Sequence, residues 1–378
     1  MKKATIVLIL TCFTMCKQKV HSDDVIFVDI DRPEISSIFD YFRSIELIPL
    51  ETSSDALIAD ISKIIVHGDR YYMLDQPQQI IFVFDQNGKF LFKINKQGKG
   101  PEEYLSVIDI NINPFTYNLE LLDPYGPVHI YDLKGNYIET KRIAYPKLQA
   151  VHQFAPVGNH SYVFYAIFQA KKIIYFNIDE KKLQHEEFEE ERYLGSFASN
   201  SLYKYQDEWY FFRPIHPVVY KIGKEQLEPA FQFDFGAYTQ EGTTAVFSDE
   251  ALMGSLSKRV KELFAQFPYL IHAVRHNSKY VFATLSRKDI NHWANIIYDK
   301  STGKTKYIID FSEKVLFNSH RGEEVIVTDE YVLMSIQWVD LEDRVTKEML
   351  DDENKDILEK VLKSKNELNP ILIKYWFK

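Results

Sequence analysis

Two short stretches of the chain combine cationic side chains with an aromatic ring, a combination that could bind a polar ligand. Arg213 and His216 lie in the first stretch, and Arg287, His292 and Trp293 lie in the second. Cations can pair with acceptor groups of a sugar or peptide, while an aromatic ring covers an apolar face of the ligand. We interpret these five residues as a candidate ligand-binding set. A solvated, charged rim is the alternative for each residue taken alone.

Residue types that could hold a metal or perform catalysis occur only in weak arrangements. His272 and His276 are four residues apart, a spacing that suits a metal pair on a helix. The surrounding sequence, IHAVRHNSKYVFATL, instead indicates two strands joined by a turn, so we interpret both histidines as interior side chains of a sheet. Four acidic residues in predicted turns could supply a general acid/base pair: Asp75, Glu102, Glu103 and Asp123.

Motifs and composition exclude several functional classes. The sequence contains no G-x-S-x-G, HExxH, P-loop, CxxC pair or calcium loop. We therefore predict no catalytic residue, no metal site and no cofactor. The formal net charge of −9, without a long basic block, argues against a nucleic-acid partner. A hydrophobic content of 46% is enough to fill a core, which excludes a disordered chain.

The N-terminus has the pattern of a secretory signal. Two lysines precede the apolar residues 4–15, and polar residues follow at once. The stretch is too short to span a bilayer as a stable helix, and no later stretch reaches 18 apolar residues. An ordinary first strand or core helix is the alternative. We predict export of the chain, with residues 1–16 as the signal segment.

Both cysteines lie inside this segment. A cysteine at the end of the apolar stretch, followed by polar residues, resembles the lipidation site of bacterial lipoproteins. We favour Cys16 over Cys12 because the apolar stretch then has its full length. The resemblance implies a lipid anchor at the outer membrane or in the periplasm, and plain secretion of a soluble protein is the alternative.

An internal repeat predicts the fold. An apolar run ending in an aromatic residue, then Asp or a substitute, a turn and a second run, recurs five times. The residues after the aromatic are Asp85, Asp132, Asn177, Lys221 and Asp299. Four of these hairpins follow one another at a period near 45 residues, which is typical of four-stranded propeller blades. The longer last interval is expected to hold an insertion. Abundant Tyr and Phe, 24 and 27 residues, also favour strands.

A sixth unit at the C-terminus is one strand short. Its last run is ILIKYWFK, and the orphan run VIFVDI at 25–30 could supply the missing outer strand. Such an exchange would close the ring and remove free sheet edges. We predict an all-β, six-bladed β-propeller over residues 23–378, closed by N-terminal strand exchange.

Several segments carry a resemblance to a known family. The segment NKQGKGPEEY at 95–104 is similar to the linker between blades of NHL-type propellers. Together with IPLETSSDALIADISKI, FDQNGKF, IIYDK and NPILIKYWFK, it makes the chain resemble the six-bladed β-propeller lipoprotein family of Bacteroidetes. The resemblance covers the whole mature chain. It implies architecture rather than activity, because that family is largely without known biochemical activity.

Blade geometry predicts a ligand face. With the strands running from axis to rim, the connections between blades and the turns between second and third strands share one face. Two predicted helical insertions, about 238–268 and 340–368, belong to this face. We expect them to pack on the propeller body and to shape a cleft over the axis, with the five candidate ligand residues in one sector of its mouth.

We expect a monomeric, non-enzymatic binding or scaffold module for a glycan, peptide or protein partner. Contact with the membrane would be through the lipid anchor only. The alternative is an enzyme, a lyase or hydrolase, with its site in the axial channel.

Overall fold

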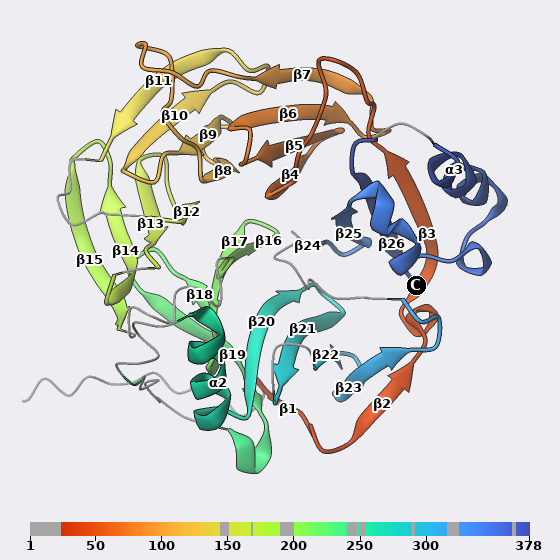
Figure 1. The fold of residues 1–378 in the computed structure, drawn as a ribbon. Helices are drawn as coiled ribbons and strands as arrows, with labels where there is room; N and C mark the ends of the chain where they lie inside the picture. Colours follow the sequence, from red (N-terminus) through yellow and green to blue (C-terminus); the bar gives the residue numbers. More distant parts are fainter. Residues whose placement is uncertain are drawn as a thin grey trace, which may run out of the picture.

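The computed structural model describes residues 24–143, 151–167, 169–189, 200–239, 248, 255–288, 292–315, 325–364 and 368–378. These residues form six β-sheets arranged as blades around a central axis (Figure 1). The predicted all-β, six-bladed β-propeller is therefore confirmed. The predicted signal segment 1–16, including Cys16, lies outside the described residues. Within them, no helix is long and apolar enough to cross a membrane.

Each blade contains four antiparallel strands ordered from the axis to the rim. Blades 1 to 3 consist of β4 (Lys63–His67), β5 (Arg70–Asp75), β6 (Ile80–Asp85) and β7 (Phe90–Ile94); β8 (Asp109–Ile112), β9 (Leu119–Leu122), β10 (Pro127–Tyr131) and β11 (Tyr137–Arg142); and β12 (Gln153–Pro156), β13 (Ser161–Tyr165), β14 (Lys171–Asn177) and β15 (Lys182–Glu189). Blades 4 to 6 consist of β16 (Leu202–Tyr205), β17 (Glu208–Arg213), β18 (His216–Ile222) and β19 (Leu227–Asp234); β20 (Tyr269–His276), β21 (Tyr280–Arg287), β22 (Trp293–Asp299) and β23 (Lys304–Phe311); and β24 (Val325–Val327), β25 (Tyr331–Ile336), β26 (Ile371–Phe377) and β3 (Phe42–Pro49).

The residue after each repeated aromatic organises the turn between the two outer strands. In blade 1, Asp85 Oδ1 accepts hydrogen bonds from the backbone N–H groups of Asn87 and Lys89, both at 2.9 Å. Gly88 adopts a positive φ of 80° in this turn, which glycine does without steric cost. Equivalent acceptors in blades 2, 3 and 5 are Asp132, Asn177 and Asp299. The repeated Asp or Asn is therefore a local turn signal, because its side-chain oxygen bonds to backbone N–H groups no more than four residues away.

The ring is closed by β3, which pairs antiparallel with β26 and places Ile45 opposite Tyr375. The prediction that residues 25–30 supply this outer strand is wrong. The closing strand must lead into the first strand of blade 1, and connections between blades are short except the one between β19 and β20, which holds the first insertion. β3 is separated from β4 by 13 residues (50–62), close to the 14 residues (95–108) between blades 1 and 2. A closing strand at 25–27 would instead have left 35 residues (28–62) to place.

The segment before β3 runs along the outside of blades 4 and 5. β1 (Val25–Phe27) pairs in parallel with β19, and β2 (Pro33–Ser36) pairs in parallel with β23. Each adds a fifth strand to its blade, as the red and orange ribbons at the rim show (Figure 1). These additions cover two sheet edges that could otherwise pair with another chain.

Six apolar clusters fill the contacts between neighbouring blades. Tyr72 and Leu74 of blade 1, for example, pack with Ile110 of blade 2. Leu333 and Leu372 of blade 6 pack against blade 1 and complete the circle. Because every blade shares an apolar cluster with both neighbours, the innermost strands are held in fixed positions around the axis.

Helices occupy the two predicted insertions. α2 (Leu256–Gln266) lies between β19 and β20, and its Leu263 packs with Ile215 and Leu270 of blades 4 and 5. α3 (Asp352–Leu362) lies between β25 and β26. The 3₁₀ helices are η2 (Ile38–Asp40), η4 (Gly236–Tyr238), η5 (Trp338–Asp343) and η6 (Lys347–Met349).

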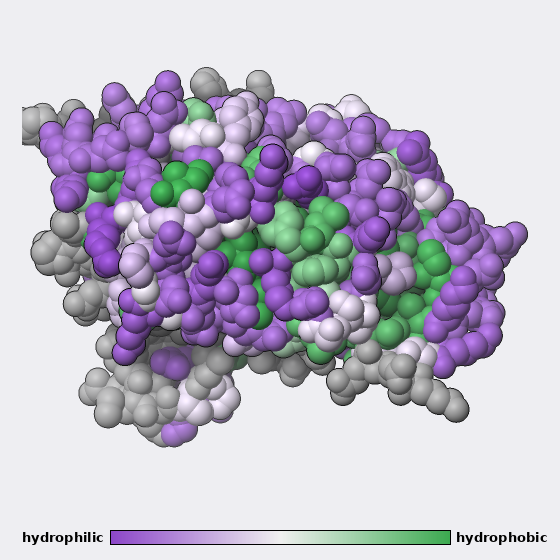
Figure 2. Space-filling view, turned by 90° about the horizontal axis from the view of Figure 1, so that it is seen from above, coloured by the Kyte–Doolittle hydropathy of each residue, from purple (hydrophilic) through white to green (hydrophobic). Residues whose placement is uncertain are grey.

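α3 covers the rim of blade 6 rather than the axis. Asp351 caps the helix by accepting a hydrogen bond from the Asn354 backbone N–H. The Asn354 side-chain oxygen in turn accepts a hydrogen bond of 2.7 Å from the backbone N–H of Leu47 in β3. The helix therefore lies beside β3 on the outside of the ring (Figure 1). The side of the molecule seen in Figure 2 is mostly hydrophilic, with apolar side chains showing between polar ones.

Candidate functional site

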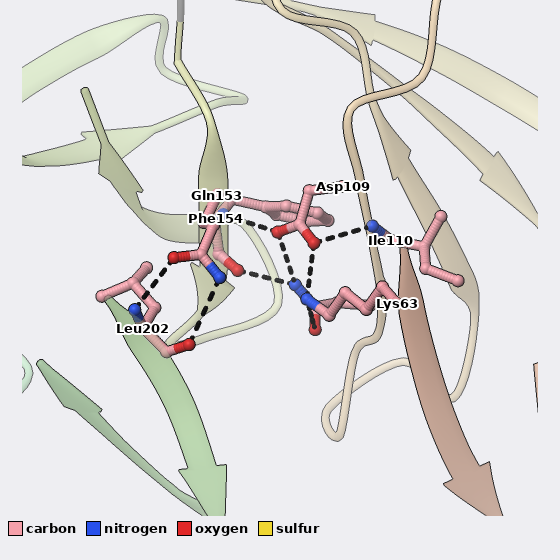
Figure 3. Close-up of polar contacts among 7 residues, drawn as sticks. Lys63, Asp109, Ile110, Gln153, Phe154 and Leu202 are labelled. Atoms are coloured by element: carbon pink, nitrogen blue, oxygen red, sulfur yellow. Dashed lines mark hydrogen bonds and ion pairs between the residues drawn. The ribbon is translucent and has the colours of Figure 1, made fainter. Parts of the chain in front are cut away.

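A buried ion pair forms the waist of the axial channel. Lys63 Nζ, from β4, lies 2.5 Å from Asp109 Oδ1 and 3.3 Å from Asn111 Oδ1, both from β8 (Figure 3). Asp109 also accepts hydrogen bonds of 3.0 Å from the backbone N–H groups of Ile110 and Phe154. Burial raises the pKa of the Asp109 carboxyl, and the charge of Lys63 opposes that rise. These contacts hold blades 1, 2 and 3 together at the axis.

The side chain of Gln153 links the waist to blade 4 by bonding to the backbone of Leu202. Gln153 Oε1 accepts from the Leu202 backbone N–H at 2.9 Å, and Gln153 Nε2 donates to the Leu202 carbonyl at 3.3 Å (Figure 3). The innermost strand of a blade has a free edge, and buried backbone groups there need partners. Polar side chains of the neighbouring blade supply those partners, which explains why polar residues alternate with apolar ones in the inner strands.

Above the waist lies a polar cavity of about 440 Å³. It opens on the face that carries the connections between blades. Burial, together with the charge of Asp75, raises the pKa of Asp60 in its wall. The lining residues are Asp60, Ile61, Ser62, Lys63, Gln76, Ile108, Asp109, His152, Gln153, Asn200, Ser335, Ile336, Gln337, Asp340 and Pro370. The second insertion thus contributes to this cavity through η5, which contains Asp340, and not through α3.

Below the waist lies a second cavity of about 690 Å³ with an aromatic lining. It opens on the opposite face, among the turns between first and second strands. The lining residues are Lys63, Ile64, Ile65, Val66, His67, Asn111, Ile112, Pro114, Phe115, Tyr117, Leu202, Tyr203, Lys204, Tyr205, Gln206, Asp207, Trp209, Arg275, Val325, Ile326, Val327, Thr328 and Asp329. Lys63 lines both cavities, so the waist separates them.

The structure places Arg213 inside the protein. Its guanidinium donates hydrogen bonds to the Tyr165 hydroxyl and, at 3.3 Å, to Ser201 Oγ. It also lies 5.6 Å from the centre of the Tyr165 ring. The side chain is fully buried, so Arg213 contributes to the contact between blades 3 and 4.

Arg287 holds the N-terminal segment. It donates to the Ile30 carbonyl at 2.6 Å and to Asp31 Oδ1 at 2.8 Å, and it lies 5.2 Å from the centre of the Tyr238 ring. Asp31 and Ile30 lie between β1 and β2. The contact therefore fastens that segment to the outside of blade 5.

The other three predicted ligand residues have separate surroundings. The ring of His216 lies edge-on to Phe188 at 5.0 Å, and the ring of Trp293 lies 4.3 Å from that of His272. His292 is exposed beside β22. As the described residues define the two cavities, none of the five predicted residues lines either one. Ligand binding by these five stays a prediction.

The two histidines weighed as a metal pair have structural partners. His276 Nδ1 lies 2.9 Å from the Tyr203 hydroxyl, and burial lowers the pKa of His276 to about 3. His272 Nε2 lies 2.7 Å from Ser286 Oγ. In the part of the chain that the structure describes, no group of three or more His, Cys, Asp or Glu side chains is arranged to hold a metal.

The acidic residues weighed as an acid/base pair order turns. Asp75 accepts hydrogen bonds from the backbone N–H groups of Ala59 at 2.6 Å and Gln78 at 3.0 Å. Asp123 and Glu103 accept in the same way from neighbouring backbone N–H groups. The carboxylate of Glu103 thus holds the linker GKGPEE, to which Glu103 itself belongs.

Sequence reasoning missed two aromatic residues of the lower cavity. Phe115 and Tyr117 lie in the turn NPFTYN between β8 and β9. The available signal was the turn itself, since connecting turns are expected to be polar and two of its six residues are large aromatics.

The fold and the channel define a six-bladed β-propeller with a ligand-sized cavity at each end of its axis. The chain belongs to the family described as Domain of unknown function (DUF4934), whose profile matches residues 24–375. A search of curated proteins finds no match.

Two solved structures have a similar fold. One is a protein of Bacteroides fragilis NCTC 9343 described as a putative exported protein, 16% identical, with a TM-score of 0.69 over 94% of this chain and 99% of the other. The second is a DUF4221 family member from Bacteroides vulgatus ATCC 8482, 10% identical, with a TM-score of 0.51 over 89% of this chain and 97% of the other. At these identities the similarity concerns the fold alone.

Proposed function

We propose that the chain is an exported, non-enzymatic binding module that takes its ligand in the axial channel. The observation that carries this proposal is the waist, which divides the channel into two cavities open at opposite faces. Their volumes, about 440 and 690 Å³, lie in the range of small-molecule sites, roughly 300–1,000 Å³. A glycan, a peptide or a segment of a protein partner is the expected ligand.

The inner strands favour binding because their polar side chains are already ordered. Lys63, Asp109 and Gln153 are held by one another or by backbone groups of the next blade. A ligand in the channel would not have to order them, and such preorganisation lowers the entropic cost of association. The closed ring of apolar clusters keeps the blades in place during binding.

Export and a lipid anchor at the outer membrane are part of the proposal. The N-terminal signal pattern supports export, and so does the similarity in fold to a Bacteroides fragilis protein described as a putative exported protein. NHL-like character and lipidation at Cys16 are predictions from the sequence. Cys16→Ser should release the protein from the membrane fraction, and several acyl chains are expected because one anchors weakly. Unchanged fractionation would remove the anchor from the proposal.

Binding is tested with glycan and peptide arrays probed by the chain from residue 22 onward. The bound ligand is then titrated against Asp60→Asn in the upper cavity and Lys204→Ala in the lower cavity. Lys182→Ala, an exposed residue on the outer strand of blade 3, is the matched control. One cavity variant should weaken binding about tenfold or more while the control does not. A ligand whose affinity is unchanged in both cavity variants would contradict a channel site.

A further inference from the structure

The lower cavity has two exposed aromatic side chains at its mouth. Phe115 and Tyr117 are 49% and 66% exposed, and both line the cavity. Tyr117 has a φ of +56°, in the left-handed region that turns usually give to glycine or asparagine. This backbone conformation is unfavourable for a bulky residue, and the exposed ring does not contribute to the core. A role of the ring in binding explains why a tyrosine occupies this position.

Hydrogen bonds of the Asn113 side chain anchor the turn that carries these rings. Asn113 is buried, and its Oδ1 accepts a hydrogen bond of 2.9 Å from the Phe115 backbone N–H. Its Nδ2 donates to Glu120 Oε1 at 2.9 Å, and the same oxygen accepts from the Tyr162 hydroxyl of blade 3 at 2.8 Å. The two aromatic rings are therefore presented on a turn that is fixed to two blades.

An unsatisfied donor lies in the wall of the same cavity. Trp209 is more than nine-tenths buried, and its Nε1 has no hydrogen-bond partner within the described ranges of the chain. The indole N–H can only donate, and buried donors without an acceptor are rare in native proteins. The Nε1 atom itself has almost no accessible surface, so a ligand oxygen in the cavity would supply the missing acceptor only after a small movement of the Trp209 side chain.

The charges around the cavity already have protein partners. Lys204 pairs with Asp207 at 3.5 Å, and Lys63 pairs with Asp109 at the waist. Asp329 accepts hydrogen bonds from Tyr205 and Ser278. Arg275 donates to two backbone carbonyls and lies over the Tyr203 ring. An ionic ligand would have to displace these contacts, whereas a neutral ligand would not.

We propose that the lower cavity binds the end of a neutral oligosaccharide, an inference that rests on the proposed use of the channel. Sugar rings combine apolar C–H faces with hydroxyl oxygens. The C–H faces pack on Phe115 and Tyr117 at the mouth. A hydroxyl oxygen accepts the hydrogen bond from Trp209 Nε1. Asn113 is a positioning residue that orients the two rings.

The test uses the exported full-length protein in mild detergent and four probes: maltohexaose, cellohexaose, mannohexaose and xylohexaose. Calorimetry should show binding of at least one. The double variant Phe115→Ala, Tyr117→Ala should weaken it at least tenfold. Tyr125→Ala is the matched control, since Tyr125 is a 77% exposed aromatic in a turn of the same blade on the opposite face, and affinity should not change.

Trp209→Phe keeps an aromatic ring in the wall and removes only the N–H donor. It should fold normally, lower the affinity about three- to tenfold and abolish the change in tryptophan emission on binding. Asn113→Ala should weaken binding although Asn113 does not contact the sugar. The double variant Asn113→Asp, Glu120→Gln should restore part of the affinity, because the new carboxylate still accepts from the Phe115 N–H and the new amide donates to it.

Three outcomes would overturn the inference. Failure of all four oligosaccharides to bind would exclude the ligand class. Binding that survives the double variant but is lost in Asp60→Asn would place the sugar in the upper cavity, and the proposed function would stand. A peptide that binds where the sugars do not, with loss in the double variant, would keep the cavity as a site and refute the carbohydrate.

Discussion

The N-terminal part of the chain completes sheet edges in two different ways. β3 pairs antiparallel with β26 through seven residue pairs and buries Phe42, Ile45 and Leu47 in the cluster between blades 5 and 6. β1 and β2 pair in parallel over three and four residues. Their Phe27 and Ile35 stay exposed, and of their apolar side chains only Ile26 is buried, in the cluster between blades 4 and 5. Both contacts are made by hydrogen bonds between the backbones of neighbouring strands. The difference is the apolar surface that each strand removes from water.

This difference indicates separate roles for the two regions. Hydrogen bonds of a strand exchange water for protein partners and contribute modestly to stability, while burial of large apolar side chains is the dominant favourable contribution. β3 should therefore hold the ring closed. β1 and β2 should mainly shield the edges of blades 4 and 5 from other chains.

Truncation should give the largest effect. A chain starting at residue 51 lacks β3, exposes the edge of β26 and opens the ring, so we expect aggregation or loss of cooperative unfolding. A chain starting at residue 37 lacks β1 and β2 but keeps β3. It loses Ile26, Val28 and Ile30 from the cluster between blades 4 and 5 and uncovers two sheet edges, so it should melt at a lower temperature than the full chain but still unfold cooperatively. Light scattering and calorimetry measure both. A cooperative, monomeric chain from residue 51 would show that β3 is dispensable for closure.

A pair of phenylalanines sharpens the comparison within the intact chain. Phe42→Ala removes a buried ring that contacts Phe377 and Tyr375, and we expect a loss of about 3–5 kcal/mol in the free energy of unfolding. Phe27→Ala removes a 58% exposed ring from β1 and should cost no more than about 0.5 kcal/mol. Denaturant titration compares the two variants. Equal losses would mean that β1 contributes to the core as much as β3 does.

The cover over β3 should have an intermediate effect. Asn354→Ala removes the acceptor for the Leu47 backbone N–H, which α3 then leaves buried without a partner. We expect a loss of about 1–3 kcal/mol in the free energy of unfolding. Asp352→Ala in the same helix turn removes only an exposed pair with Lys355 and should change stability by less than about 0.5 kcal/mol. Similar losses in the free energy of unfolding for the two variants would show that α3 does not stabilise β3.

The smallest effect concerns the fastening of β1 and β2. The hydrogen bond from Arg287 holds the pKa of Asp31 below its ordinary value of 3.8. The ionised carboxylate therefore contributes stability above pH 3.8, and that contribution is lost as the pH falls through the lower folded pKa. Hydrogen exchange of the β1 amides, corrected for intrinsic rates, should increase on acidification below this value. Asp31→Asn should show the faster exchange already at pH 5. Exchange in β3 should not respond to either change.

The number of blades and the turns of the hairpins could be predicted because their signals are local. Asp85 bonds to N–H groups two and four residues away, and Asp132 does the same in blade 2. Such contacts depend only on neighbouring residues, so they recur wherever the pattern recurs. The surroundings of the predicted ligand residues could not be predicted, because charge near a turn does not reveal what the side chain will face. Arg213 faces Tyr165, 48 residues away, in another blade.

The sequence by itself determined the repeat, the strand periodicity, the turn geometry and the two helical insertions, since each follows from hydrogen bonds and apolar spacing within a few residues. Only the tertiary structure decided which N-terminal strand closes the ring, because the choice depends on the sheet edge that each strand meets and on the apolar surface that it buries there. It also decided that Trp209, which packs in the core between blades 3 and 4, lines the lower cavity as well. Whether a strand residue meets solvent, a neighbour or a channel is set by the angle and distance between blades, which arise when all six pack together.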